Sequence, residues 1–88
     1  MKFEMGKIVI TSNANYMLNL WFVRWIIKYR YSRGDWGNIP ESDWRENDKA
    51  LINGGRLLAS YTDVNGVKFW IITEADRSYT TVLLPEDY

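Results

Sequence analysis

The sequence contains no cysteine and no histidine among its 88 residues. A chain without thiols and imidazoles cannot build a disulfide, a zinc finger, a cysteine nucleophile or a Ser-His triad. Only carboxylates, Lys, Tyr, Ser and Thr remain as candidate catalysts, and no glycine-rich motif that cradles phosphate is present. We therefore expect a protein that is not an enzyme and that uses no cofactor and no metal.

The short length predicts a single domain over residues 1–88, because a second independent core needs more chain. Its stability must come from apolar packing, and aromatic residues make up 16% of the chain. Each aromatic side chain can bury roughly 150 to 250 Å², so a core without metals or disulfides is feasible. The absence of cysteine and of a charged, then apolar, leader pattern at the start predicts a cytoplasmic protein.

The net charge is zero, but the charges are unevenly distributed. Residues 1–33 contain six basic residues and one acidic residue, whereas residues 34–88 contain five basic and ten acidic residues. Such an asymmetry can steer a charged partner, and it can equally hold the two halves of a small domain together. Composition alone leaves both interpretations open.

β-branched runs and apolar alternation predict four strands, at residues 7–11, 57–62, 67–73 and 79–84. The pair Asn65-Gly66 is a strong hairpin signal between the second and third of these. Helices are predicted over residues 16–31 and from about Asn38 to residue 53, before Gly54-Gly55. The expected fold is α+β in the order β-α-α-β-β-β, with two helices packed on one face of an antiparallel sheet.

The second predicted helix is weakly amphipathic. Asn38 is its expected N-cap, with Glu41 three residues later. Its expected inward face consists of Trp44, Asn47, Ala50 and Leu51.

The predicted helix at residues 16–31 is apolar on two sides. At 100° per residue, one face contains Leu18, Trp21, Phe22, Trp25, Ile26 and Tyr29. A second face contains Tyr16, Leu20, Val23, Ile27 and Tyr31. A small domain has little material to bury a helix all round. One face should therefore meet the sheet, and the other should meet either the second helix or another chain.

We expect the second face, with Val23 and Ile27, to contact a partner, because an uncovered apolar patch of that size is a liability unless it is used. The partner is expected to be another protein, with a homodimer as an open possibility. Aromatic anchors and basic steering residues would extend the surface into the turn at residues 34–37. The candidate partner-binding residues are Leu20, Trp21, Val23, Arg24, Trp25, Ile27, Lys28, Tyr29, Tyr31, Arg33, Asp35 and Trp36.

The composition of this segment also bears on nucleic acid and on a membrane as partners. Its cations and rings could hold phosphates and stack on bases, but the zero net charge argues against nucleic acid as the partner. A membrane span is not expected, because Arg24 and Lys28 interrupt an apolar run already shorter than about 20 residues.

The turn near residues 74–78 is the best candidate for carboxylate chemistry. Glu74 and Asp76 could divide acid and base roles, with Arg77 beside them. Charged turn residues more often bond to the backbone and to each other, so we expect a structural role.

Several segments carry a resemblance to known proteins: RGDWG at 33–37, ENDKAL at 46–51, GRLLASY at 55–61, KFWIITEADRS at 68–78 and TTVLLPEDY at 80–88. They are similar to a family of small bacterial proteins carried by plasmids, integrative elements and phages, whose members are labelled plasmid-related protein or type I restriction subunit M. The resemblance covers residues 33–88 and the first strand, and it carries over no site residues. Residues 16–31 depart from it, because they are loaded with Trp, Phe and Ile.

Carriage on mobile elements implies one class of function, a stoichiometric inhibitor of a host defence system such as an anti-CRISPR or anti-restriction protein. The predicted order of elements is also similar to that of the RelE and ParE toxins, whose ribonuclease members use basic residues. That analogy of topology supplies the enzymatic alternative, although the zero net charge argues against a ribosome-binding surface.

Overall fold

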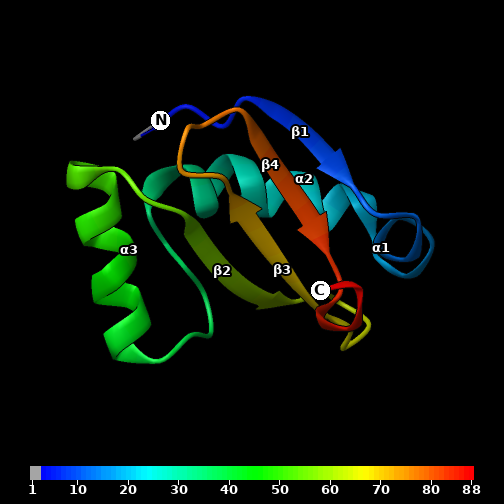
Figure 1. Ribbon diagram of the computed structural model, residues 1–88. Helices are drawn as coiled ribbons and strands as arrows, with labels where there is room; N and C mark the ends of the chain where they lie inside the picture. The colour runs from blue at the N-terminus through cyan, green and yellow to red at the C-terminus, as the bar shows by residue number, and fades with distance from the viewer. Residues whose placement is uncertain (1–2) are drawn as a thin grey trace.

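Four strands form one sheet in the order β1-β4-β3-β2. A computed structural model describes residues 3–88 (Figure 1). The strands are β1 (Lys7–Ile10), β2 (Leu57–Thr62), β3 (Lys68–Thr73) and β4 (Tyr79–Leu83). The helices are α1 (Ser12–Met17), α2 (Leu20–Tyr29) and α3 (Glu41–Asn53), with short 3-10 turns η1 (Tyr31–Arg33) and η2 (Pro85–Asp87).

The α+β class is confirmed, but the expectation of a fully antiparallel sheet is wrong. Strands β2, β3 and β4 form an antiparallel meander, whereas β1 pairs with β4 in parallel. The helical crossover returns the chain to the end of the sheet where β1 began, so β2 runs in the direction of β1. Two hairpins then reverse the chain twice, and β4 arrives beside β1 with the same direction.

The predicted continuous helix at residues 16–31 is broken into two helices at Leu18 and Asn19. Leu18 has an extended backbone, with φ −95° and ψ 151°. The Asn19 side chain accepts a hydrogen bond from the Phe22 amide at 3.0 Å and so caps α2. The Asn19 amide in turn donates to the carboxylate of Asp63, in the β2–β3 turn, at 3.1 Å. The sheet therefore determines where α2 begins.

Asp63 is buried and remains a carboxylate. Burial acts to raise its pKa, but the backbone N–H groups of Val67, Asn19 and Asn65 outweigh burial and hold the pKa below its usual range. One carboxylate thus organises both the hairpin turn and the start of α2.

Helix α3 begins three residues later than predicted and does not lie on the face of the sheet. Its first residue is Glu41, because the backbone of Asn38 is used elsewhere: its amide donates to the Ser60 carbonyl at 2.7 Å. The predicted end before Gly54 is confirmed, as is the burial of Asn47 and Ala50. The helix stands beside the edge of β2 (Figure 1), so the sheet face is covered mainly by α2, with Ala14 of α1 and Leu18 completing the buried cluster.

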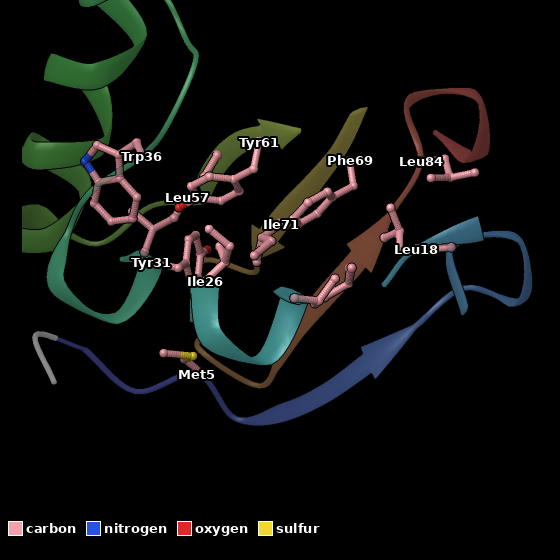
Figure 2. Close-up of a cluster of buried hydrophobic side chains, with 14 of the residues drawn as sticks. Met5, Leu18, Ile26, Tyr31, Trp36, Leu57, Tyr61, Phe69, Ile71 and Leu84 are labelled. Carbon is pink, nitrogen blue, oxygen red and sulfur yellow. The ribbon is translucent and has the colours of Figure 1, made fainter. Parts of the chain in front are cut away.

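The core lies between α2 and one face of the sheet (Figure 2). Val23 and Ile26 are the buried residues of α2, and Ile26 is fully buried. Burying each such side chain contributes about 1.5–3 kcal/mol. Figure 2 shows Tyr31 and Trp36 at one end of the cluster and Leu84 at the other.

A chain of buried hydroxyl groups crosses this core. The Thr80 hydroxyl donates to the Met5 carbonyl at 2.6 Å, so its proton is not available to Thr73, 2.8 Å away. Thr73 must therefore donate to Thr80, and Tyr31 must donate to Thr73 across 2.6 Å. Burial raises the pKa of Tyr31 to about 12, which keeps this donor protonated. These hydroxyl hydrogen bonds connect η1 to β3, to β4 and to the segment before β1.

The outer edge of β2 is closed by side-chain and backbone pairing. The Asn47 amide group donates to the Leu58 carbonyl at 2.7 Å and accepts from the Leu58 amide at 3.2 Å, as a neighbouring strand would. The Ser60 amide donates to the Trp36 carbonyl at 3.2 Å, and the Ser60 carbonyl accepts from Asn38. These contacts satisfy edge groups that would otherwise be free to pair with another chain.

The second face of the sheet is covered in part by the C-terminal segment. The Tyr88 ring packs edge-on against Trp70, with 5.6 Å between the ring centres, and Arg56 bonds to the Tyr88 hydroxyl. The Asp87 carboxylate accepts from the Thr11 hydroxyl at 2.6 Å. The chain end is thereby fixed to the start of α1.

The direction of the hydroxyl chain predicts an order of stabilities. Tyr31→Phe removes the first donor and leaves every remaining hydroxyl with an acceptor, so it should cost about 1 kcal/mol. Thr73→Val strands the buried Tyr31 hydroxyl without an acceptor and should cost more, about 1–3 kcal/mol. Urea unfolding followed by circular dichroism measures both. A larger loss of stability in Tyr31→Phe than in Thr73→Val would contradict the assigned direction.

Candidate functional site

Three aromatic side chains form an exposed stripe along α2. Trp21, Trp25 and Tyr29 follow one another at intervals of four residues and therefore share one side of the helix. They are 80%, 50% and 44% exposed, respectively. Because Val23 and Ile26 occupy the side of α2 that meets the sheet, this stripe faces solvent.

Three cations lie against the same rings. The Arg24 guanidinium lies 5.6 Å from the ring centre of Trp21. The Lys28 ammonium and the Arg33 guanidinium lie 5.4 and 5.6 Å from the ring centre of Tyr29. These distances are typical of cation–π contacts. We refer to Trp21, Arg24, Trp25, Lys28, Tyr29 and Arg33 together as the α2 surface.

The α2 surface is positively charged. The sequence has no acidic residue between Glu4 and Asp35. Among residues 3–88, the ion pairs are Arg30 with Asp35, Arg45 with Glu41 and Lys49 with Glu46, and none of them involves a cation of the α2 surface. Those cations are therefore available to a partner.

The rings of the α2 surface support one another. Trp25 stacks on Phe22, with 6.3 Å between ring centres and 24° between planes, and its other neighbour Tyr29 lies 5.9 Å away. Aromatic pairs of this kind are worth about 0.5–1.5 kcal/mol each. The stripe is thus partly ordered before any partner arrives, which lowers the entropic cost of binding.

Of the twelve candidate partner-binding residues, seven are exposed on one side of the protein, three are buried and two are half-buried. Exposed on or beside the α2 surface are Leu20, Trp21, Arg24, Trp25, Lys28, Tyr29 and Arg33. Val23, Tyr31 and Trp36 are buried, with exposed fractions of 3%, 0% and 0%, and so cannot contact a partner. Ile27 and Asp35 are half-buried.

The expected partner face with Val23 and Ile27 is therefore turned toward the core. Both faces are apolar, so the residue pattern alone does not distinguish the one that packs against the sheet from the one that stays exposed. Val23 and Ile26, assigned to different faces from the sequence, are buried together, while Trp21 of the expected sheet face is the most exposed of the three aromatics in the stripe.

The turn at residues 34–37 is bonded to the rest of the fold. Arg30 Nε donates to the Asp35 carboxylate at 2.8 Å, and this bond holds the pKa of Asp35 below its usual range. The Gly37 amide also donates to Asp35, at 3.1 Å. Trp36 Nε1 donates to the Asp48 carboxylate at 3.0 Å, which anchors the ring to α3.

The charged turn at residues 74–78 bonds to the backbone around it. Arg77 has a φ of 63°, and its guanidinium donates to the Gly55 carbonyl at 2.6 Å and the Ala50 carbonyl at 3.1 Å. These bonds satisfy carbonyl groups at the end of α3. The Asp76 carboxylate accepts from the Ser78 amide and hydroxyl at 3.0 and 2.6 Å. The contacts of Arg77 and Asp76 are those of a structural turn.

A second feature, which the sequence reasoning missed, lies along β1. Ile8 and Ile10 are 50% and 36% exposed. With Leu20 and Ile27 they line a hollow of about 180 Å³ between β1 and α2. The available signal was the apolar run at residues 8–10 in a strand at the edge of the sheet.

No helix among residues 3–88 is long and apolar enough to cross a membrane. No cluster of carboxylates in that part of the chain is arranged to hold a metal ion.

The assignment of faces predicts unequal losses of stability when Val23 and Trp21 are each replaced by Ser. Val23→Ser buries a hydroxyl and loses apolar contact, so it should destabilise the fold by at least about 2 kcal/mol. Trp21→Ser alters an exposed position and should change stability by less than about 1 kcal/mol. Thermal unfolding compares the two variants. A result in which Trp21→Ser is the more damaging would show that the faces are assigned the wrong way round.

The comparisons with known proteins leave the function to be argued from this geometry, because no protein-family model, no curated protein and no solved structure matches the chain.

Proposed function

We propose that the chain is a non-enzymatic protein-binding module that docks through the α2 surface. The observation that carries the proposal is the exposure of Trp21, at 80%, beside two further exposed rings. Trp and Tyr are the residues that most often dominate binding energy at protein interfaces, with Arg. All three types are concentrated on one side of one helix.

Two features favour a protein over a single-stranded nucleic acid. Bases stack on free ring faces, but a cation covers part of Trp21 and two cations flank Tyr29. The chain also has no net positive charge with which to gather a polyphosphate. The α2 surface better suits an apolar pocket with an acidic rim, into which the rings insert while the cations pair with carboxylates.

We further propose that the partner belongs to a bacterial defence system. The resemblance of residues 33–88 to proteins carried by mobile elements supports this class. In such an inhibitor, a small scaffold presents one surface that blocks a larger protein. Here most of the scaffold comes from the segments that carry the resemblance, and the α2 surface, apart from Arg33, comes from residues 16–31, which depart from it.

The test is a plating assay in bacteria protected by a restriction system or by CRISPR immunity. Expression of the chain should raise the plating efficiency of a phage that this immunity excludes. Replacing Trp21 and Trp25 by Ala should abolish the gain, because loss of an anchor ring costs at least about 2 kcal/mol, roughly thirtyfold in affinity. Ile52→Ala is the matched control, since Ile52 is 84% exposed on α3 and distant from α2 in sequence.

Two outcomes would count against the proposal. An equal gain in phage plating efficiency from the parent chain and from the Trp21, Trp25 double variant would show that the rings do not dock. Tight binding of a single-stranded oligonucleotide, with affinity that falls steeply as salt is raised, would replace the protein partner by a nucleic acid.

A further inference from the structure

The outer edge of β1 is an open hydrogen-bonding edge. The Lys7 amide donates to the Ser78 carbonyl and the Thr11 amide to the Val82 carbonyl, each at 3.0 Å. Backbone groups alternate in direction along a strand, so the N–H and C=O groups of Ile8 and Ile10 point away from β4. No strand among residues 3–88 lies beyond β1 in the sheet.

The two edges of the sheet therefore differ in whether their outward backbone groups are paired. At β2, a side-chain amide and a length of backbone pair with the edge. Proteins that do not use an edge commonly blunt it with a bulge, a proline or a covering segment. The β1 edge instead exposes two isoleucines, Ile8 and Ile10.

The β1 edge is accompanied by hollows shaped for side chains. The hollow of about 180 Å³ between β1 and α2 has an apolar base that includes Leu20 and Ile27. A second hollow, of about 440 Å³, continues along the same side and is lined by Ile8 and Tyr29 among others. A strand laid against β1 would place every second side chain over these hollows.

The rim of the hollows is basic. Arg24 lines the first hollow, and Lys28 and Arg33 line the second. Neither hollow has an acidic residue in its lining. An incoming strand that interleaves acidic and apolar residues matches both the base and the rim.

The same charges disfavour a second copy of this chain as the occupant. If two copies paired through β1 about a two-fold axis, both α2 helices would lie on the same side of the joined sheet. The two sets of cations would then face each other without an acidic partner, which costs binding energy. Charge complementarity therefore selects an acidic strand from another protein.

We infer that the β1 edge receives an extended acidic and apolar segment of the partner protein as a fifth strand, with its apolar side chains in the β1–α2 hollows. This inference rests on the proposed function, since it names how the protein partner docks. Main-chain bonds to Ile8 and Ile10 supply affinity, and the pockets and cations supply selectivity, as in other cases of strand addition.

The test uses random linear peptides displayed on phage and selected on the immobilised chain at low salt. The selected peptides should alternate apolar and acidic residues. Ile8→Pro should weaken their binding about tenfold or more, because it removes an outward N–H while leaving the inward bonds to β4 in place. Ile8→Val keeps that N–H and should bind as the parent chain does.

Circular dichroism would reveal whether Ile8→Pro fails to fold. A second variant tests the same inference in that case. Arg24 and Lys28 are both exposed, so replacing both with Glu should leave the fold intact and abolish binding of the acidic peptides.

Each remaining outcome overturns the inference in a recognisable way. If the peptides bind Ile8→Pro as well as the parent chain but do not bind Trp21→Ala, they dock on the rings. That result keeps the proposed function and rejects the strand site. A dimer in sedimentation that Ile8→Pro dissociates assigns the edge to a second copy. A selection that yields no binding peptide rejects the strand site, while the plating assay decides the proposed function independently.

Discussion

The pairing of β2 with Asn47 and with residues 36–38 is the constraint on which the rest of the structure depends. It fixes α3 beside the sheet instead of on its face. It also holds the backbone of Trp36, whose ring then packs against Tyr31 with 5.5 Å between centres. Since α3 and the turn are used to close this edge, α2 is left to cover the sheet face, with only the short α1 and Leu18 beside it.

As a consequence of this arrangement, apolar groups in the N-terminal third of the chain stay exposed. One helix can bury one side only, so the rings of α2 opposite Val23 and Ile26 remain in solvent. Among residues 3–88, β1 likewise has no neighbouring strand on its outer side. Both exposed features lie in a stretch without acidic residues, between Glu4 and Asp35. Apolar exposure and positive charge thus coincide, which is the arrangement expected of a docking region.

Sequence patterns predicted the elements whose causes are local. The strands near residues 57–62, 67–73 and 79–84 and the end of α3 before Gly54 follow from alternation and turn residues within a few positions. Asn19 is a local N-cap signal at the break, but the Asp63 carboxylate that holds the Asn19 amide is 44 positions away and is not visible from the local pattern. The burial of Val23 and Ile26 together shows that the face expected to be free for a partner packs against the sheet instead. The parallel pairing of β1 likewise depends on the path of the whole chain.

Amide hydrogen exchange of the isolated chain, followed residue by residue by NMR, tests most directly the claim that one sheet edge is sealed and the other open. The amides of Leu58 and Ser60 should be protected, because Asn47 and Trp36 accept their hydrogen bonds. The amides of Ile8 and Ile10 should exchange rapidly, while those of Lys7 and Thr11, which donate to carbonyls at β4, stay protected. Protection of Ile8 and Ile10 equal to that of Lys7, or rapid exchange at Leu58 and Ser60, would contradict the account.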